Sequence, residues 1–72
     1  MPDKNVSELI NIVRAGAGVT LRAEELTVDD VLPIARAAGE AKVVVRVIGG
    51  LQWRTHDLVQ IAKVGEGCII FE

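Results

Sequence analysis

The sequence has few of the residues that usually give a small domain extra stability. Among its 72 residues there is one cysteine, Cys68, and one histidine, His56. A lone cysteine excludes a disulfide within the chain, and these two side chains cannot supply the three or four ligands of an ordinary zinc site. A free thiol is typical of a reducing compartment. We therefore expect a cytoplasmic protein without a metal or other cofactor.

Aromatic residues are also scarce, with one Trp, one Phe and no Tyr. The chain is long enough for a single domain, residues 1–72, whose core must be filled with Val, Ile, Leu and Ala. A core of this size seldom supplies more than about 3–5 kcal/mol, and disulfides, metal ions or self-association usually add the rest. With the first two excluded, the composition favours self-association.

Strong charge and long apolar runs are absent as well. The formal net charge of −2 is too weak to indicate binding to nucleic acid or to an anionic membrane. No apolar run approaches the ~18–20 residues of a membrane span, and the N-terminal segment Met1-Pro2-Asp3-Lys4-Asn5 is polar as a whole, unlike a secretory signal. We expect neither nucleic acid nor a membrane as a partner.

Three segments with helical spacing alternate with three runs typical of strands. Each helical segment has apolar residues at i, i+3 and i+4, which form one face of a helix. These sets are Leu9, Ile12 and Val13; Val31, Ile34 and Ala35; and Leu58, Ile61 and Ala62. The strand-like runs cover residues 19–23, 42–48 and 68–72. The order αβαβαβ predicts a small α/β domain.

Capping residues mark the helix boundaries. Side-chain oxygens that accept free backbone N–H groups mark the starts, and glycines, which tolerate a left-handed conformation, mark the ends. The expected starts are Asn5, Thr27 and Thr55, and the expected ends are Gly16, Gly39 and Gly65. Pro33 lies well inside the second segment, so this helix either is kinked or begins nearer Asp29 or Asp30.

The three units can be superimposed as imperfect repeats of helix and strand, although similar periodicity could also arise by chance. The equivalent positions are Ile12, Ile34 and Ile61 in the helices, then Val19, Val43 and Ile69, and Leu21, Val45 and Phe71 in the strands. Strands joined through helices are parallel, with right-handed crossovers. We therefore predict a three-stranded parallel sheet. Its general plan is similar to short α/β repeats such as leucine-rich repeats, but their Leu-x-x-Leu-x-Leu-x-x-Asn signature is absent.

One face of this sheet is the expected interface. If all helices lie on one side, the other face carries Thr20, Arg22, Val44, Arg46, Ile70 and Glu72. If helices lie on both sides, Val44 and Ile70 belong to the core. In the one-sided arrangement we expect Arg22, Arg46 and Glu72 at corresponding places in the three strands, where opposite charges can pair across a two-fold axis.

The predicted function is a non-enzymatic module that associates with itself, forming a homo-oligomer, or with another protein. The contact would involve this face or the free edge of the strand at residues 68–72. A unit belonging to a larger repeat protein is an alternative source of the partner surface.

The alternative function is binding of an anion or phosphate after the second strand. There, Gly49 and Gly50 precede a helix start with possible donors at Arg54, Thr55 and His56. The segment matches neither the G-x-G-x-x-G fingerprint nor a phosphate loop, and a glycine pair usually makes a turn.

No catalytic residue is predicted. His56 follows the second strand at its carboxyl end, whereas Cys68 begins the third strand at the opposite end of the sheet, beyond the ~3 Å reach of a Cys–His pair. Trp53 precedes the third helix, where we expect it to pack onto Leu58 as a hydrophobic staple or, alternatively, to lie at an interface.

Overall fold

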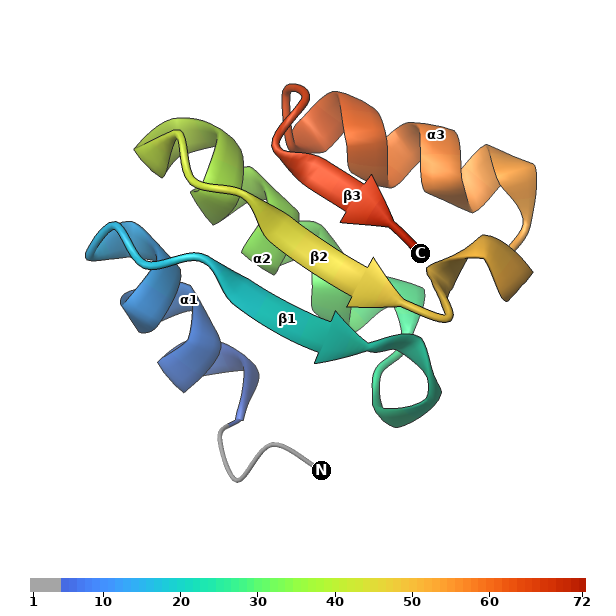
Figure 1. Ribbon diagram of the computed structural model, residues 1–72, viewed down its shortest axis with the longest axis horizontal. Helices are drawn as coiled ribbons and strands as arrows, with labels where there is room; N and C mark the ends of the chain where they lie inside the picture. Colours follow the sequence, from blue (N-terminus) through green and yellow to red (C-terminus); the bar gives the residue numbers. More distant parts are fainter. Residues whose placement is uncertain (1–4) are drawn as a thin grey trace.

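The computed structural model describes residues 5–72 and shows the alternating order of helices and strands that the sequence predicts (Figure 1). The α-helices are α1 (Val6–Arg14), α2 (Val28–Ala41) and α3 (Thr55–Val64), and the strands are β1 (Val19–Arg22), β2 (Val45–Ile48) and β3 (Ile69–Phe71). A 3₁₀ turn follows each of the first two strands, η1 (Ala23–Glu25) and η2 (Gly50–Gln52), and neither was expected. Residues 1–4, on which the expectation of no secretory signal partly rests, lie outside the described residues.

The strands form one parallel sheet in the order β1-β2-β3, so consecutive strands are neighbours. Figure 1 shows all three α-helices behind the sheet and both crossovers right-handed. The arrangement with helices on both faces is therefore wrong, and the one-sided arrangement is confirmed. Leu21, Val45 and Val47 are buried on the helical side, whereas side chains on the other face are exposed. We call that uncovered side the open face.

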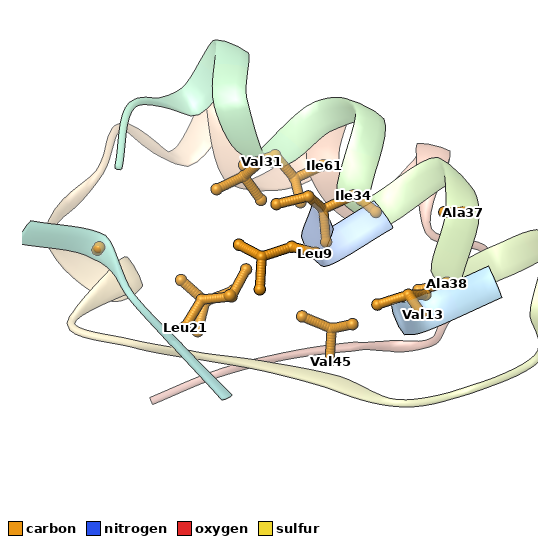
Figure 2. Close-up of a cluster of buried hydrophobic side chains, with 12 residues drawn as sticks. Leu9, Val13, Leu21, Val31, Ile34, Ala37, Ala38, Val45 and Ile61 are labelled. Atoms are coloured by element: carbon orange, nitrogen blue, oxygen red, sulfur yellow. The ribbon is translucent and has the colours of Figure 1, made fainter. Parts of the chain in front are cut away.

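The core lies between the sheet and the helices, with α2 in contact with both α1 and α3. Figure 2 shows aliphatic side chains from the helices meeting those from the strands. In α2, Val31, Ile34 and Ala35 have no exposed surface. The terminal helices are buried less completely, since α3 has Ile61 as its one buried residue and leaves Ala62 exposed. The stripe predicted for the third helix is thus only partly correct.

The register of the sheet differs from the predicted alignment by two residues in the middle strand. Val19 pairs with Val45, which pairs with Ile69, and Leu21 pairs through Val47 with Phe71. The expected strand at residues 42–48 begins later because Lys42 adopts a left-handed conformation after α2. A shift of two residues keeps every side chain on its predicted face.

Two helix starts follow the predicted capping chemistry. The Asn5 and Thr27 side chains accept the backbone N–H groups of Glu8 and Asp30 at 2.9 and 3.2 Å, and both form complete capping boxes. The later start near Asp29 or Asp30 is wrong, because α2 begins at Val28 and Pro33 lies inside the helix. For α3 the prediction was displaced by one residue: Arg54 is the N-cap, without a side-chain cap, and Thr55 is the first helical residue.

The predicted helix ends are correct for two of the three glycines. Gly16 has the expected positive φ, 103°, just after the cap of α1, and Gly65 caps α3 with an ordinary φ of −82°. Gly39 is instead buried within α2, which continues to Ala41. A side chain at Gly39 would meet the backbone at the end of α3, so this glycine is explained by helix packing and not by termination.

None of the helices in residues 5–72 has the length and apolar content needed to cross a bilayer.

Candidate functional site

The open face is organised in rows that run across the three strands. One row contains Thr20, Arg46 and Ile70, which are direct partners in the ladder. The next contains Arg22, Ile48 and Glu72. Arg22 pairs with Ile48, and Glu72 lies opposite Ile48 because its N–H donates to Val47 O at 3.0 Å while its carbonyl accepts Gly49 N–H at 2.7 Å. All side chains of both rows are exposed.

The expected charge row is therefore corrected. Arg46 does not share a row with Arg22 and Glu72, since it lies two residues before Ile48 on β2. Its guanidinium instead reaches diagonally to the Glu72 carboxylate, with a Nη1–Oε2 distance of 3.4 Å. Arg22 lies 3.7 Å from Glu24 in η1, measured from Nη1 to Oε1. Both are surface ion pairs, each worth at most about 1 kcal/mol in isolation.

Large aliphatic side chains remain in water on this face. Val44 is 49% exposed, Ile48 44% and Ile70 40%. The sequence prediction missed Ile48 as an interface residue, although its alternation with Val44 and Arg46 was a usable signal. A shallow hollow of about 410 Å³ lies beside Val44 and Ile70, and it is lined by Gly18, Val19, Thr20, Val44, Arg46 and Ile70. The structure therefore brings all six predicted interface residues to one surface and adds Ile48.

The predicted anion-binding residues are divided between two places. Gly49 adopts a left-handed conformation, φ 82°, at the end of β2, and its N–H group already donates to Glu72. Gly50 is buried, and a side chain there would come within 3.0 Å of Val47 and Phe71. The glycine pair thus serves a turn and close packing. Beyond η2, Arg54, Thr55 and His56 are exposed at the start of α3.

A second hollow, of about 390 Å³, lies at the carboxyl ends of β1 and β2. It is lined by Arg22, Ala23, Glu24, Ile48, Gly49, Gln52 and Trp53. Of the predicted anion-binding residues, only Gly49 belongs to this lining. The Gly49 amide has no donor to offer because it is engaged in the sheet, so the helix start and the hollow do not form one phosphate cradle.

Trp53 is half-buried against the edge of the core. It immediately precedes the Arg54 cap of α3, and Leu58 is the fourth helical residue, so both occupy the positions of a hydrophobic staple. Trp53 also lines the hollow at the carboxyl edge. Its main contribution is to packing, with one side left accessible.

His56 and Cys68 are at opposite ends of the sheet. His56 is in the first turn of α3, near the carboxyl end of β2, whereas Cys68 immediately precedes β3. Within residues 5–72, no three His, Cys, Asp or Glu side chains are grouped so that they could hold a metal ion.

Comparisons with protein-family models, curated proteins and solved structures gave no match. The open face and the carboxyl edge of the sheet are therefore the two candidate functional surfaces of this protein.

Proposed function

We propose that this protein is a self-association module and that its contact surface is the open face of the sheet. The observation that carries this proposal is the cluster of three large aliphatic side chains, Val44, Ile48 and Ile70, exposed on a sheet whose other side is covered by helices. Sheets in soluble proteins usually carry polar side chains on a face left to water. An uncovered aliphatic centre with a polar rim is typical of an interface.

The open face belongs to the broad side of a molecule that extends 29 × 26 × 18 Å. The three short strands cover only part of that side because neighbouring strands lie about 4.8 Å apart, so a contact through the strands alone is smaller than the roughly 800 Å² that each partner contributes to a standard interface. Burial of apolar surface contributes about 25 cal/mol per Å² removed from water, so the aliphatic centre supplies the driving force. The ion pairs around it contribute orientation more than affinity.

A second copy supplies this partner surface without any further component. Arg22, Arg46, Glu24 and Glu72 place both signs of charge on or beside the open face, and so the face is electrostatically compatible with itself. A strongly acidic or basic partner would not be electrostatically complementary to this face. The other proposed partner, a different protein, would have to present a similarly mixed surface.

The test is the molar mass in solution, measured by light scattering over a concentration series. We expect the parent protein to form an oligomer and Ile70→Glu to be a folded monomer, with circular dichroism reporting the retained helices. Val59→Glu is the matched control because Val59 is 46% exposed on α3, away from the open face. A strictly monomeric parent at millimolar concentration contradicts the proposal, as does equal dissociation by both variants.

A further inference from the structure

The row at the carboxyl end of the open face has an arrangement that specifies a symmetry. Its outer members carry opposite charges, Arg22 on β1 and Glu72 beside β3, and its middle member is Ile48 on β2. All three are exposed, with 63% of the Arg22 side chain and 45% of the Glu72 side chain accessible. The distribution of charge across the row is therefore antisymmetric about the middle strand.

A two-fold axis that relates two copies packed through this face lies in the plane of the face, and two directions of that axis keep the strands of the two copies aligned. An axis parallel to the strands and over β2 exchanges the positions of β1 and β3, so each Arg22 faces Glu72 of the second copy and Ile48 faces its own counterpart. An axis across the strands instead keeps β1 over β1 and reverses its direction. If that axis passes over Thr20, it brings Arg22 over Gly18 and pairs no opposite charges.

We propose that the open face is occupied by a second copy of this chain, related by a two-fold axis parallel to the strands, with two reciprocal Arg22–Glu72 pairs. This inference rests on the proposed self-association and adds the relative orientation of the two copies and the residues that fix it. An isologous contact of this kind closes on itself and gives a dimer. Val44, which immediately precedes β2, and Ile48, which ends it, lie on the axis and form the apolar centre.

Arg46 is the residue that this arrangement must accommodate, since it lies on β2 between Val44 and Ile48. Its guanidinium is drawn toward β3 by the 3.4 Å contact with Glu72, and thus away from the axis and from Arg46 of the second copy. Each Glu72 then lies between Arg46 of its own chain and Arg22 of the other. The apolar stem of Arg46 can remain over Val44 and Ile70 while its charged end stays hydrated.

Charge reversal tests the pairing directly. In a dimer of Arg22→Glu, two carboxylates face each other at both pairing positions, and in a dimer of Glu72→Arg, two guanidinium groups do so. Like charges in contact oppose association, so we expect each variant alone to weaken dimerisation about tenfold or more. In a heterodimer of the two variants, one chain carries carboxylates at both positions and the other carries guanidinium groups at both. Each position then pairs opposite charges, so an equimolar mixture of the two variants should recover dimerisation as a heterodimer. The double variant, Arg22→Glu with Glu72→Arg, restores an opposite-charge pair at both positions and should dimerise more tightly than either single variant. Recovery to the full parental affinity is not expected, because Glu72→Arg also removes the carboxylate that holds Arg46 away from the axis.

Light scattering and mass spectrometry of the intact complexes read out the result, and circular dichroism confirms that each variant is folded. Arg36→Glu, an exposed reversal on α2, is the control for net charge and should leave dimerisation unchanged. If the parent dimerises but the double variant remains as weak as the single variants, the proposed axis is wrong while self-association stands. If the parent is monomeric, the proposed function itself is overturned. Weakening in both single variants with recovery in the double variant supports the inference.

Discussion

Gly39 in α2 and Gly65 at the end of α3 approach each other backbone to backbone. A Cβ atom on Gly39 would lie 3.1 Å from the Gly65 carbonyl oxygen and 3.2 Å from that of Val64. A Cβ atom on Gly65 would in turn lie 2.4 Å from Cγ1 of Ile69. The missing side chains therefore allow α2, the end of α3 and the start of β3 to pack in one place.

Gly39→Ala should destabilise the protein despite improving helix propensity. Alanine in a helix interior is favoured over glycine by roughly 1 kcal/mol, but the added methyl group must displace the backbone at the end of α3, and overpacking typically costs about 1–3 kcal/mol. We expect a net loss of about 1 kcal/mol in urea unfolding. Glu40→Ala, at the exposed neighbouring position, is the control and should change stability little. If Gly39→Ala is more stable than the parent protein, the end of α3 can move to accommodate the methyl group without a loss of stability.

Gly18→Ala should be more damaging, because the obstacle is a strand backbone. The new Cβ atom would lie 2.6 Å from the Val44 carbonyl oxygen, which cannot move without displacing the entry to β2. A loss of about 2–3 kcal/mol is expected from overpacking of this kind. Ala17→Ser, at the adjacent exposed residue, serves as the control. Thermal unfolding in dilute solution distinguishes Gly18→Ala from Ala17→Ser. Equal unfolding midpoints for the two variants would contradict the close approach of Gly18 to the Val44 carbonyl.

Arg54→Ser should stabilise the protein. Arg54 has the extended conformation of an N-cap, φ −63° and ψ 143°, but provides no side-chain acceptor, unlike Asn5 and Thr27 at the other helices. A serine hydroxyl can accept a free N–H group of the first turn, and such caps contribute about 0.5–2 kcal/mol. The reciprocal change Thr27→Ala should lose about the same amount. If neither substitution changes the free energy of unfolding, capping hydrogen bonds do not contribute measurably to the stability of this protein.

If an inorganic phosphate binds anywhere, the donors at Arg54, Thr55 and His56 are the predicted place. Backbone amide shifts during a phosphate titration should then be largest at Thr55 and His56 and small at Gly49, whose N–H group is engaged by Glu72. Arg54→Ser provides the matched variant because it removes the cationic side chain while keeping the helix start. Shifts confined to the open face would reject the carboxyl-edge prediction.

Periodicity in the sequence was sufficient for the architecture, because apolar spacing reports directly which side of a helix or strand is covered. The alternation of Leu21 with Thr20 and Arg22, for example, predicted both faces of β1 correctly. Gly39 shows what periodicity cannot provide. The role of Gly39 depends on its contact with α3, which is distant in the sequence. From the sequence alone, a glycine that ends a helix cannot be distinguished from a glycine that allows two helices to pack closely.

The residues of the open face were likewise predicted, but their pairing across the strands was not. A shift of two residues in β2 preserved the side of every residue, yet it replaced Arg46 by Ile48 in the charged row. Register between strands is set by loop conformation, here the left-handed Lys42 and the turns around the strands, which propensity does not determine. The charge pattern across the sheet could be assigned only once the ladder was known.

The helical layer is broader than the sheet that it covers, and this limits how the molecule can grow. Packed helices lie about 8–10 Å apart and strands about 4.8 Å, so α1 and α3 project past the edge strands in Figure 1. If a strand of another molecule paired with β1 or β3, the helices of that molecule would clash with α1 or α3. The end helices thus oppose the fibre-like addition of strands at either edge, which agrees with the proposed contact through the open face.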